Sequence, residues 1–255
     1  MKEEDRQRAI RLKLARFDSG PARRLGPAIP TGFAALDAAL GSGLPRGSIV
    51  ELFGPPSSGK TTLALQVVAH LSKSGGTAAW IDAERVFDAA YAAQLGVKLA
   101  ELPVMQPESA EQALDMALKL AASGAVDVMV VDSAAALVPR LELAAGLGET
   151  GHGLHSRVLA SGLRKLARAA ANCDTSVVFL NQVRARPESG GAPGVETAET
   201  SAGGPPLKLY AAVRIALCPA GSGRVRLRVL KNKLAGASNP GELRWKQEGG
   251  FAESP

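Results

Sequence analysis

One glycine-rich stretch constrains the fold of this chain more than any other feature. Residues 54–61 read Gly-Pro-Pro-Ser-Ser-Gly-Lys-Thr and match the pattern GxxxxGK[ST]. An apolar segment, 48–53, comes directly before it, and a segment with helical periodicity, 60–74, follows. A strand, a glycine-rich loop and a helix in this order form a P-loop, in which backbone N–H groups and the helix dipole bind phosphates. The pattern therefore predicts an α/β domain with a phosphate-binding loop at the end of a buried strand.

The rest of the chain continues this alternation of strands and helices. Ser109 and Gln112 form a capping box, which predicts the start of a helix that ends near residue 123. The other predicted elements are a helix at 153–171 and strands at 77–82, 126–131, 176–180, 208–217 and 224–230. Unbroken apolar strands separated by helices are typical of a mostly parallel sheet that binds ligands at the carboxyl ends of its strands.

Two segments fall outside this alternation. Residues 3–17 are predicted to form a short amphipathic helix, and a Gly/Pro-rich linker follows it. We therefore divide the chain into an N-terminal helical arm, residues 1–26, and a core, residues 27–255. The arm must bury its apolar stripe against its own core or against a neighbouring subunit. The second segment is a loop of about twenty residues after Asn181, and loops of this length are more often functional or disordered than merely connecting.

Composition limits the partners that the chain can have. The formal net charge of +6 makes nucleic acid a plausible partner, although only 4% of the residues are aromatic, and surfaces that stack bases need aromatic side chains. The sequence has no apolar run long enough to span a bilayer, and its start has no apolar signal-peptide core. We therefore expect a cytoplasmic protein that does not contact a membrane.

The residues around the P-loop predict the chemistry of a nucleotide site. Lys60 is expected to reach the β- and γ-phosphates, and the Thr61 hydroxyl to bind Mg²⁺. Asp132 ends an apolar strand, as the Walker B aspartate does, although an aspartate there could also cap the next element. Ser133 follows it where many ATPases have the catalytic base, so the base must come from elsewhere. Glu84 is the candidate if its strand adjoins the P-loop strand; from placement alone, a solvated loop acid is an equally good interpretation.

Several of these segments together resemble the bacterial RecA recombinase family. They are, in order, GPPSSGKTTLALQ, WIDAERVFDAAYAAQLGV, SGAVDVMVVDSAAAL, FLNQVR and VLKNKLA. The resemblance runs from the N-terminal helix to about Phe251 and so covers nearly the whole chain. Single motifs of this kind are shared by many P-loop ATPases, whereas this ordered set is specific to the family. The resemblance implies a RecA-type P-loop NTPase core that uses ATP and Mg²⁺.

The resemblance also implies roles for individual residues in the nucleotide site. Glu84 stands at the position of the catalytic glutamate, and Gln182 at that of the γ-phosphate sensor; with Lys60 they form the implied catalytic set. Asp88 and Tyr91 match the residues that hold adenine. The implied nucleotide-binding residues are Gly54, Ser57, Ser58, Gly59, Lys60, Thr61, Thr62, Asp88, Tyr91, Asp132, Lys231 and Lys233, with Thr61 and Asp132 at the metal.

Further positions match residues that contact a neighbouring subunit or DNA. Lys231 and Lys233 resemble the pair that reaches across the filament interface to the neighbour's ATP. The positions that match contacts to the backbone of single-stranded DNA are Arg157, Arg164, Arg184, Gly203 and Gly204. Without the resemblance, a solvated helix face is the better interpretation of Arg157 and Arg164.

The sequence departs from the family pattern in several ways. We expect this protein to lack the family's C-terminal domain, which acts as a gate for duplex DNA. The long loop has no aromatic residue between Val183 and Leu209, and Leu209 itself replaces an interface phenylalanine. Pro205 and Pro206 follow the glycine pair and remove two backbone N–H donors. These departures make strand exchange by this protein alone a weaker expectation than ATP binding.

Two functions remain open at this point. The resemblance implies a DNA-dependent ATPase of the recombinase type that binds single-stranded DNA as a helical filament and acts in DNA repair. The alternative, from a non-enzymatic class, is an accessory paralogue resembling the ImuA proteins of SOS mutagenesis, with a full-length recombinase or a translesion polymerase as its partner. The missing domain and the altered loop favour the alternative, whereas the complete set of ATPase positions favours the first function.

Overall fold

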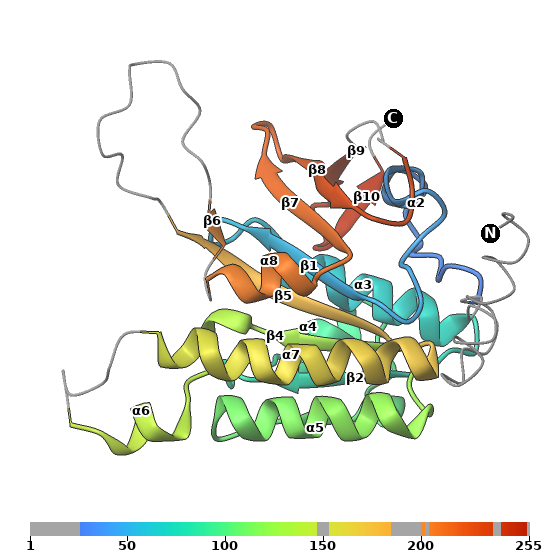
Figure 1. Cartoon of the computed structure of the whole chain (residues 1–255). Coiled ribbons are helices and arrows are strands. Elements are labelled where there is room, and N and C mark those ends of the chain that lie inside the picture. Colours follow the sequence, from blue (N-terminus) through green and yellow to red (C-terminus); the bar gives the residue numbers. More distant parts are fainter. Residues whose placement is uncertain (1–25, 147–152, 185–199, 202–203, 237–240, 254–255) are drawn as a thin grey trace, which may run out of the picture.

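The computed structural model describes residues 26–146, 153–184, 200–201, 204–236 and 241–253, and its centre is one large sheet (Figure 1). The strand order is β10-β9-β8-β7-β1-β5-β4-β2-β3, with β6 paired to β5. The strands are β1 (Ile49–Gly54), β2 (Ala78–Asp82), β3 (Val104–Met105), β4 (Val128–Asp132), β5 (Ser176–Arg184), β6 (Thr200–Ser201), β7 (Val213–Pro219), β8 (Arg224–Asn232), β9 (Gly241–Trp245) and β10 (Phe251–Glu253). From β7 to β3 neighbouring strands are parallel, and from β7 to β10 they are antiparallel.

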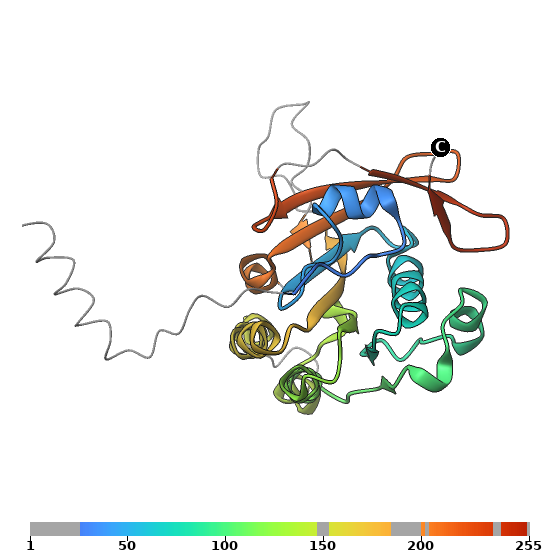
Figure 2. The ribbon, with the colours of Figure 1, turned by 90° about the vertical axis from the view of Figure 1, so that its right-hand side faces the viewer.

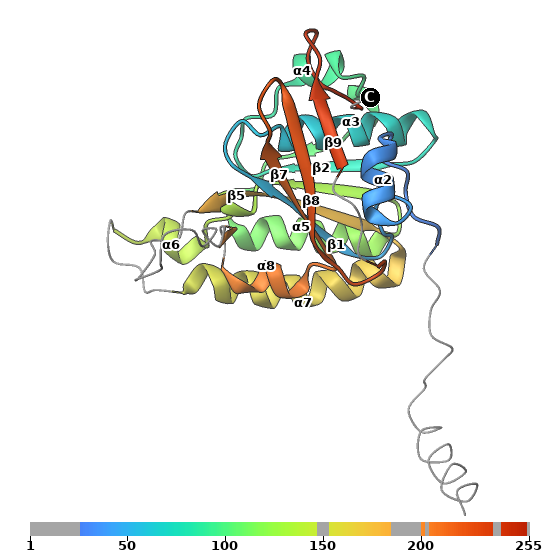
Figure 3. The ribbon, with the colours of Figure 1, turned by 90° about the horizontal axis from the view of Figure 1, so that it is seen from above.

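Helices cover both faces of the sheet. They are α2 (Ala34–Leu40), α3 (Lys60–Lys73), α4 (Ala89–Gln94), α5 (Ala110–Ser123), α6 (Arg140–Ala144), α7 (Leu154–Cys173) and α8 (Pro205–Tyr210), with short 3₁₀ turns at Leu99–Glu101 and Ala134–Ala136. Figure 2 shows α5, α7 and α8 on one side of the sheet and α2 and α3 on the other. Seen from above, β7, β8 and β9 run side by side and α2 lies next to β9 (Figure 3).

The two helical layers explain why the parallel strands are mostly apolar. Every residue of β1, β2 and β4 is buried. Along β1, Val50 and Leu52 pack in the cluster around α3, whereas Ile49 packs in the cluster that contains α5 and α7. Because successive side chains of a strand point to opposite faces, a strand between two helical layers must be apolar on both. The fold is therefore an α/β fold with a mostly parallel sheet, as the sequence predicts.

Most predicted elements are confirmed, with small shifts at their ends. The Ser109 hydroxyl accepts a hydrogen bond from Gln112 N at 3.2 Å, as expected for the start of α5. The reciprocal bond of the capping box is displaced by one residue, because the Gln112 side chain accepts from Glu108 N. The strand expected at 176–180 is longer and extends to Arg184.

One expectation about the sheet is wrong, and one condition is not met. The strand predicted at 208–217 begins only at Val213, because Pro205–Tyr210 form helix α8. Both prolines lie in the first turn of that helix, where backbone N–H groups have no intrahelical acceptor and proline is well tolerated. The condition attached to Glu84, that its strand adjoins the P-loop strand, is not met, because β5 and β4 separate β2 from β1. The predicted helix at 3–17 lies outside the described residues.

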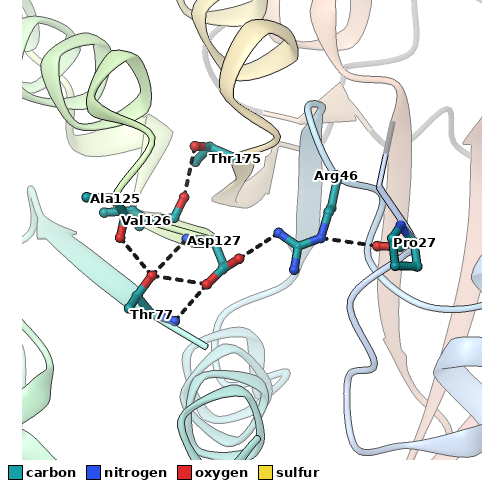
Figure 4. A network of polar contacts seen from close by, with 7 residues as sticks. All are labelled: Pro27, Arg46, Thr77, Ala125, Val126, Asp127 and Thr175. Carbon is teal, nitrogen blue, oxygen red and sulfur yellow. Dashed lines mark hydrogen bonds and ion pairs between the residues drawn. The ribbon is translucent and has the colours of Figure 1, made fainter. Parts of the chain in front are cut away.

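A polar network holds the amino-terminal edge of the sheet (Figure 4). Asp127 accepts hydrogen bonds from Thr77 N at 2.9 Å and from the Thr77 hydroxyl at 3.0 Å, and it pairs with Arg46 Nη1 at 2.6 Å. Arg46 Nε in turn donates to the Pro27 carbonyl at 3.1 Å, close to the start of the described chain. Burial pushes the pKa of Asp127 upward, but the hydrogen bonds from Thr77 and Arg46 hold it below its usual value. This network joins β2, β4 and the segment that leads into α2.

The described part of the chain contains no helix long and apolar enough to cross a membrane.

We predict that Asp127→Asn destabilises the protein by about 1 kcal/mol at neutral pH, because a partly exposed, multiply hydrogen-bonded carboxylate contributes on that scale. The folded-state pKa lies below the unfolded value of 3.8, so the contribution is present above that pH and is lost as the pH falls through the folded-state pKa. Urea unfolding of both proteins at neutral and acidic pH measures this difference. A penalty that is the same at every pH would contradict the assignment to the ionised carboxylate.

Candidate nucleotide-binding site

Two glycines shape the loop between β1 and α3. A Cβ atom on Gly54 would lie 2.6 Å from the Leu217 carbonyl oxygen and 2.7 Å from Ser58 Oγ, so only glycine fits at the end of β1. Gly59 has φ of +88°, in the left-handed region, and a Cβ there would lie 2.3 Å from the ring of Phe251. The Phe251 ring and the Trp245 ring, 4.2 Å apart, therefore form a wall against the loop.

Lys60 begins α3 and points back across the loop. Its ammonium donates to the carbonyls of Gly54 at 3.1 Å and Pro55 at 2.8 Å. Burial lowers the pKa of Lys60, and the carboxylates of Asp132 and Glu84 oppose this decrease. The lysine thus lies between the loop backbone and two acidic groups, in the position from which a cation can bind phosphate oxygens.

Thr61 connects α3 to the end of β4. Its hydroxyl donates to Asp132 Oδ2 at 2.9 Å. The pKa of Asp132 is raised to about 6, mainly by burial. The nearby carboxylates of Glu84 and Asp82 also raise this pKa, whereas the Thr61 hydrogen bond and the charge of Lys60 lower it. A hydroxyl and a buried carboxylate at this distance are the oxygen donors that Mg²⁺ prefers.

Glu84 reaches the same edge although its strand is not next to β1. The Ser133 hydroxyl donates to Glu84 Oε1, and the backbone N–H groups of Ala83 and Glu84 both donate to the Asp132 carbonyl, at 2.7 and 3.2 Å. The half-buried carboxylate is therefore fixed to the end of β4 rather than free in solvent. The sequence alone left a solvated loop acid equally open for Glu84, and these contacts favour the role of a base.

Asp82 supports this loop and was missed by the sequence analysis. The side chain is buried at the end of β2, where its carboxylate accepts hydrogen bonds from Val86 N at 3.2 Å, Phe87 N at 3.1 Å and Gln106 Nε2 at 2.9 Å. These bonds fold the chain back directly after Glu84. The available signal was an aspartate at the end of an apolar strand, the same signal that identified Asp132.

Asp88 and Tyr91 lie together at the start of α4. Asp88 is exposed and caps this helix, because its carboxylate accepts a hydrogen bond from Tyr91 N at 2.9 Å. The Tyr91 hydroxyl lies 3.0 Å from the hydroxyl of Thr62 in α3, which places the tyrosine ring beside the P-loop helix. The loop between β9 and β10 completes this region, since Gln94 Nε2 donates to the Glu248 carbonyl at 2.6 Å.

Gln182 lies on one side of the P-loop strand, and Lys231 of β8 and Lys233, directly after β8, lie on the other side. Gln182 is exposed and is in register with Gly54 on the neighbouring strand. Lys231 donates to the carbonyls of Lys208 at 2.6 Å and Leu209 at 3.2 Å, at the end of α8. Lys233 is exposed, and strand β7 separates both lysines from β1.

The predicted DNA contacts lie on and beside α7. Arg157 and Arg164 are exposed, and Arg164 Nε donates to the Tyr210 hydroxyl of α8 at 3.2 Å. Gly204 has φ of +75°, and a Cβ there would lie 2.7 Å from Ser156 Oγ, so the chain enters α8 directly beside α7. Arg168 is also exposed, and it lies on the same side of α7 as Arg157 and Arg164, because the three arginines are seven and four residues apart. The sequence analysis missed Arg168. The side chain of Arg184, and Gly203, lie outside the described residues.

The residues at this edge fit a nucleotide with its metal ion. The loop offers backbone N–H groups and the Lys60 ammonium for phosphates, and Thr61 with Asp132 offers hard oxygen donors. Ser57, Ser58, Gly59 and Thr62 lie in the same loop and first helical turn. Among the described residues, no cluster of three or more His, Cys, Asp or Glu side chains forms a metal site made by the protein alone.

We predict that Asp132→Asn stabilises the protein in Mg²⁺-free buffer by about 2 kcal/mol at neutral pH. The folded-state pKa of about 6 exceeds the unfolded value of 3.8, so ionisation of the carboxyl costs stability as the pH rises through this window. The gain should therefore be present above pH 6 and vanish below pH 3.8. Denaturant titrations at both pH values measure it, and Asp127→Asn serves as a control with the opposite sign. A loss of stability at neutral pH would refute this account.

Comparisons with known proteins agree on the relationship of this chain. The sequence model of the family described as RecA N-terminal domain matches residues 22–243. The RecA protein of Paramagnetospirillum magneticum is 44% identical over 91% of this chain and 69% of its own length. The RecA protein of Thermus thermophilus is 44% identical over 93% of this chain and 74% of its own length.

A solved structure shows the same fold at lower sequence identity. The crystal structure of the RadB recombinase matches with a TM-score of 0.69 and 22% identity, and the match covers 89% of this chain and all of the RadB chain. The family model and the two relatives cover most of the chain, including the P-loop, the acidic residues at the ends of β2 and β4, and the strands that flank them. On these grounds the chain belongs to the RecA family.

Proposed function

We propose that this protein is an ATPase of the recombinase type, which acts in the cytoplasm and forms a filament on single-stranded DNA. The observation that carries the proposal is the meeting of Lys60, Thr61, Asp132 and Glu84 at one edge of the sheet, in hydrogen-bonded or electrostatic contact with one another. The family relationship supports the ATPase class.

The contacts of these residues support a mechanism for ATP hydrolysis. Lys60 and the loop N–H groups bind the β- and γ-phosphates, and Gln182 contacts the γ-phosphate from the next strand. Thr61 and Asp132 would hold Mg²⁺, which would supply positive charge to neutralise the phosphate oxygens. Glu84, fixed by Ser133, orients a water molecule and takes its proton as the oxygen attacks the γ-phosphorus. The bond from that phosphorus to the bridging oxygen breaks, and ADP carries away the negative charge.

The position of Tyr91 supports an adenine-binding role. Tyr91 is partly buried beside the first turn of α3, where its hydroxyl lies 3.0 Å from the hydroxyl of Thr62. An aromatic ring next to the phosphate loop offers a face on which a base can stack. Asp88 retains one carboxylate oxygen beyond the one that caps α4, and this oxygen is available for the amino group of adenine.

Exposed leucines support assembly of several copies. Leu209, Leu230 and Leu234 are 67%, 47% and 52% exposed, and they border Lys231. Apolar groups of this size gathered near a lysine suit a surface that a neighbouring copy covers. In the proposed filament, Lys231 and Lys233 contact the ATP of that neighbour, and the arm formed by residues 1–26 adds to the interface with the core of residues 27–255.

A basic stripe on α7 supports binding to the DNA backbone. Arg157, Arg164 and Arg168 are exposed on the same side of the helix, and Gly204 brings the chain that follows the long loop next to them. Guanidinium groups along one helix face can bind phosphates without regard to base sequence. Arg184 and Gly203 belong to this proposed surface, although the structure describes neither the Arg184 side chain nor Gly203.

We predict that Lys60→Ala and Glu84→Gln separate nucleotide binding from turnover. Lys60→Ala removes the charge that binds the phosphates and should abolish ATP binding. Glu84→Gln keeps an oxygen that accepts from Ser133 but cannot take a proton, so turnover should fall by about 10²–10⁴-fold with binding retained. A fluorescent ATP analogue measures binding, and phosphate release measures turnover. Equal nucleotide affinity of wild type and Lys60→Ala would overturn the assignment of the site.

We predict that Arg164→Ala weakens binding to single-stranded DNA of every sequence and lowers the slope of log affinity against log salt by about one unit. Lys165→Ala is the matched control, because Lys165 is an exposed cation on the same helix that faces the groove toward α5. Fluorescence anisotropy with labelled oligonucleotides, with and without ATP, provides the measurement. Equal effects of both variants would reject the stripe as the DNA surface. No binding by the wild type would favour the accessory function through protein partners.

A further inference from the structure

Glu51 brings a carboxylate into the centre of the sheet. It lies on β1, three residues before Gly54, and its side chain is fully buried. An ionised carboxylate at such a place is strongly unfavourable unless it is paired and its oxygens accept hydrogen bonds. The partners of Glu51 therefore show what this residue does for the sheet.

The two oxygens of Glu51 bind partners on the two neighbouring strands. Asn181 Nδ2, on β5, donates to Oε1 at 2.9 Å. Arg214 Nε, on β7, donates to Oε2, and its guanidinium lies 4.8 Å from the centroid of the Phe53 ring. The carboxylate thus bridges three parallel strands across the P-loop strand.

On the β5 side, this bridge leads to Gln182. The Asn181 side chain uses its amide nitrogen for Glu51 and its oxygen, Oδ1, to accept from Gln182 N at 2.9 Å. Asn181 is buried, whereas Gln182 is exposed and in register with Gly54. The backbone of Gln182 is therefore set by a side chain whose own orientation is set by Glu51.

On the β7 side, the bridge leads to Lys231. Arg214 is in register with Lys231 on β8, and the Lys231 ammonium donates to the carbonyls of Lys208 and Leu209 in α8. Burial lowers the pKa of Lys231. The positive charges of Lys233 and Arg214 lower this pKa further, whereas the charge of Glu51 raises it. The charge on Glu51 thus acts on Lys231 as well as on Arg214.

We propose that Glu51 is the positioning residue that holds Gln182 and Lys231 in register with the P-loop strand. Through Asn181 it sets Gln182 beside the γ-phosphate, and through Arg214 it sets Lys231 on the surface offered to the next copy. The inference rests on the proposed function, which gives Gln182 and Lys231 their roles. One buried carboxylate then couples the nucleotide of one subunit to the contact with its neighbour.

The substitution Glu51→Gln tests this arrangement because it changes one acceptor into a donor at nearly constant shape. If the new amide oxygen accepts from Arg214, the new amide nitrogen faces Asn181 Nδ2, and two donors meet. Asn181 can avoid this conflict only by turning its own oxygen away from Gln182 N. Adding Asn181→Asp restores an acceptor for both neighbours, and the double variant has the same net charge as the wild type.

The experiment compares four proteins by hydrogen exchange and mass spectrometry: wild type, Glu51→Gln, Asn181→Asp and the double variant. In each single variant, backbone amides at the end of β5 and in α8 should exchange about tenfold faster, whereas those of α3 stay unchanged. The double variant should return to within about threefold of the wild type. Leu52→Ala is the control for general loosening, since Leu52 is buried on the opposite face of β1 and lies outside this network.

A second measurement follows function in the same proteins. Glu51→Gln should bind a fluorescent ATP analogue as the wild type does, because Lys60 and Thr61 are untouched. Its DNA-stimulated ATP turnover should fall by about tenfold through kcat, and the double variant should recover it. Leu52→Ala should not show this separation of nucleotide binding from turnover.

Three results would overturn the inference. The first is an unchanged amide exchange rate at β5 and α8 in Glu51→Gln. The second is faster exchange that also includes α3, as in Leu52→Ala. The third is a double variant that exchanges as fast as the single variants. Loss of nucleotide binding together with turnover in Glu51→Gln would also count against it. If the wild type itself lacks DNA-stimulated turnover, the proposed function fails, while the exchange comparison still decides the positioning role of Glu51.

Discussion

Burial of the parallel strands on both faces is the constraint on which the rest of this structure depends. A strand between two helical layers has room for polar side chains only where it leaves the sheet, or where each polar atom finds a partner inside. The chemistry therefore gathers at the carboxyl ends: Lys60 after β1, Glu84 after β2, Asp132 at the end of β4 and Gln182 near the end of β5. Glu51 is an exception within a strand, and two donors satisfy it.

The sequence predicted the parts of the site that depend on local pattern. The P-loop can be read from glycine and lysine spacing because its conformation needs residues without a Cβ at two positions. Asp132 could be read from the end of an apolar strand for a similar reason. Helix α8 could not be predicted from the sequence. A pair of prolines is typical of a loop, and here Pro205 and Pro206 occupy the first turn of a helix.

The order of the strands could not be predicted, and several contacts depend on it. Glu84 reaches the site through the backbone of β4 rather than from a strand next to β1. The partners of Glu51 come from residues 130 and 163 positions away in the sequence, so no local pattern predicts them. Asp82 stands at the end of an apolar strand as Asp132 does, but its partners in the next loop and at Gln106 could not be predicted from the sequence.

The wall that the Phe251 and Trp245 rings form against the phosphate loop is completed late, both in folding and in the synthesis of the chain. The Gln66 side chain exchanges two hydrogen bonds with the backbone of Phe251, 185 residues further along the chain, and the Phe251 ring covers Gly59. Contacts between such distant residues form late, because the intervening chain must first be brought together, and β10 leaves the ribosome after β1 to β9. A growing chain therefore carries its strand, loop and helix long before it has the wall that supports them. The aromatic cover over Gly59 therefore forms only when β10, the last strand described, joins the sheet.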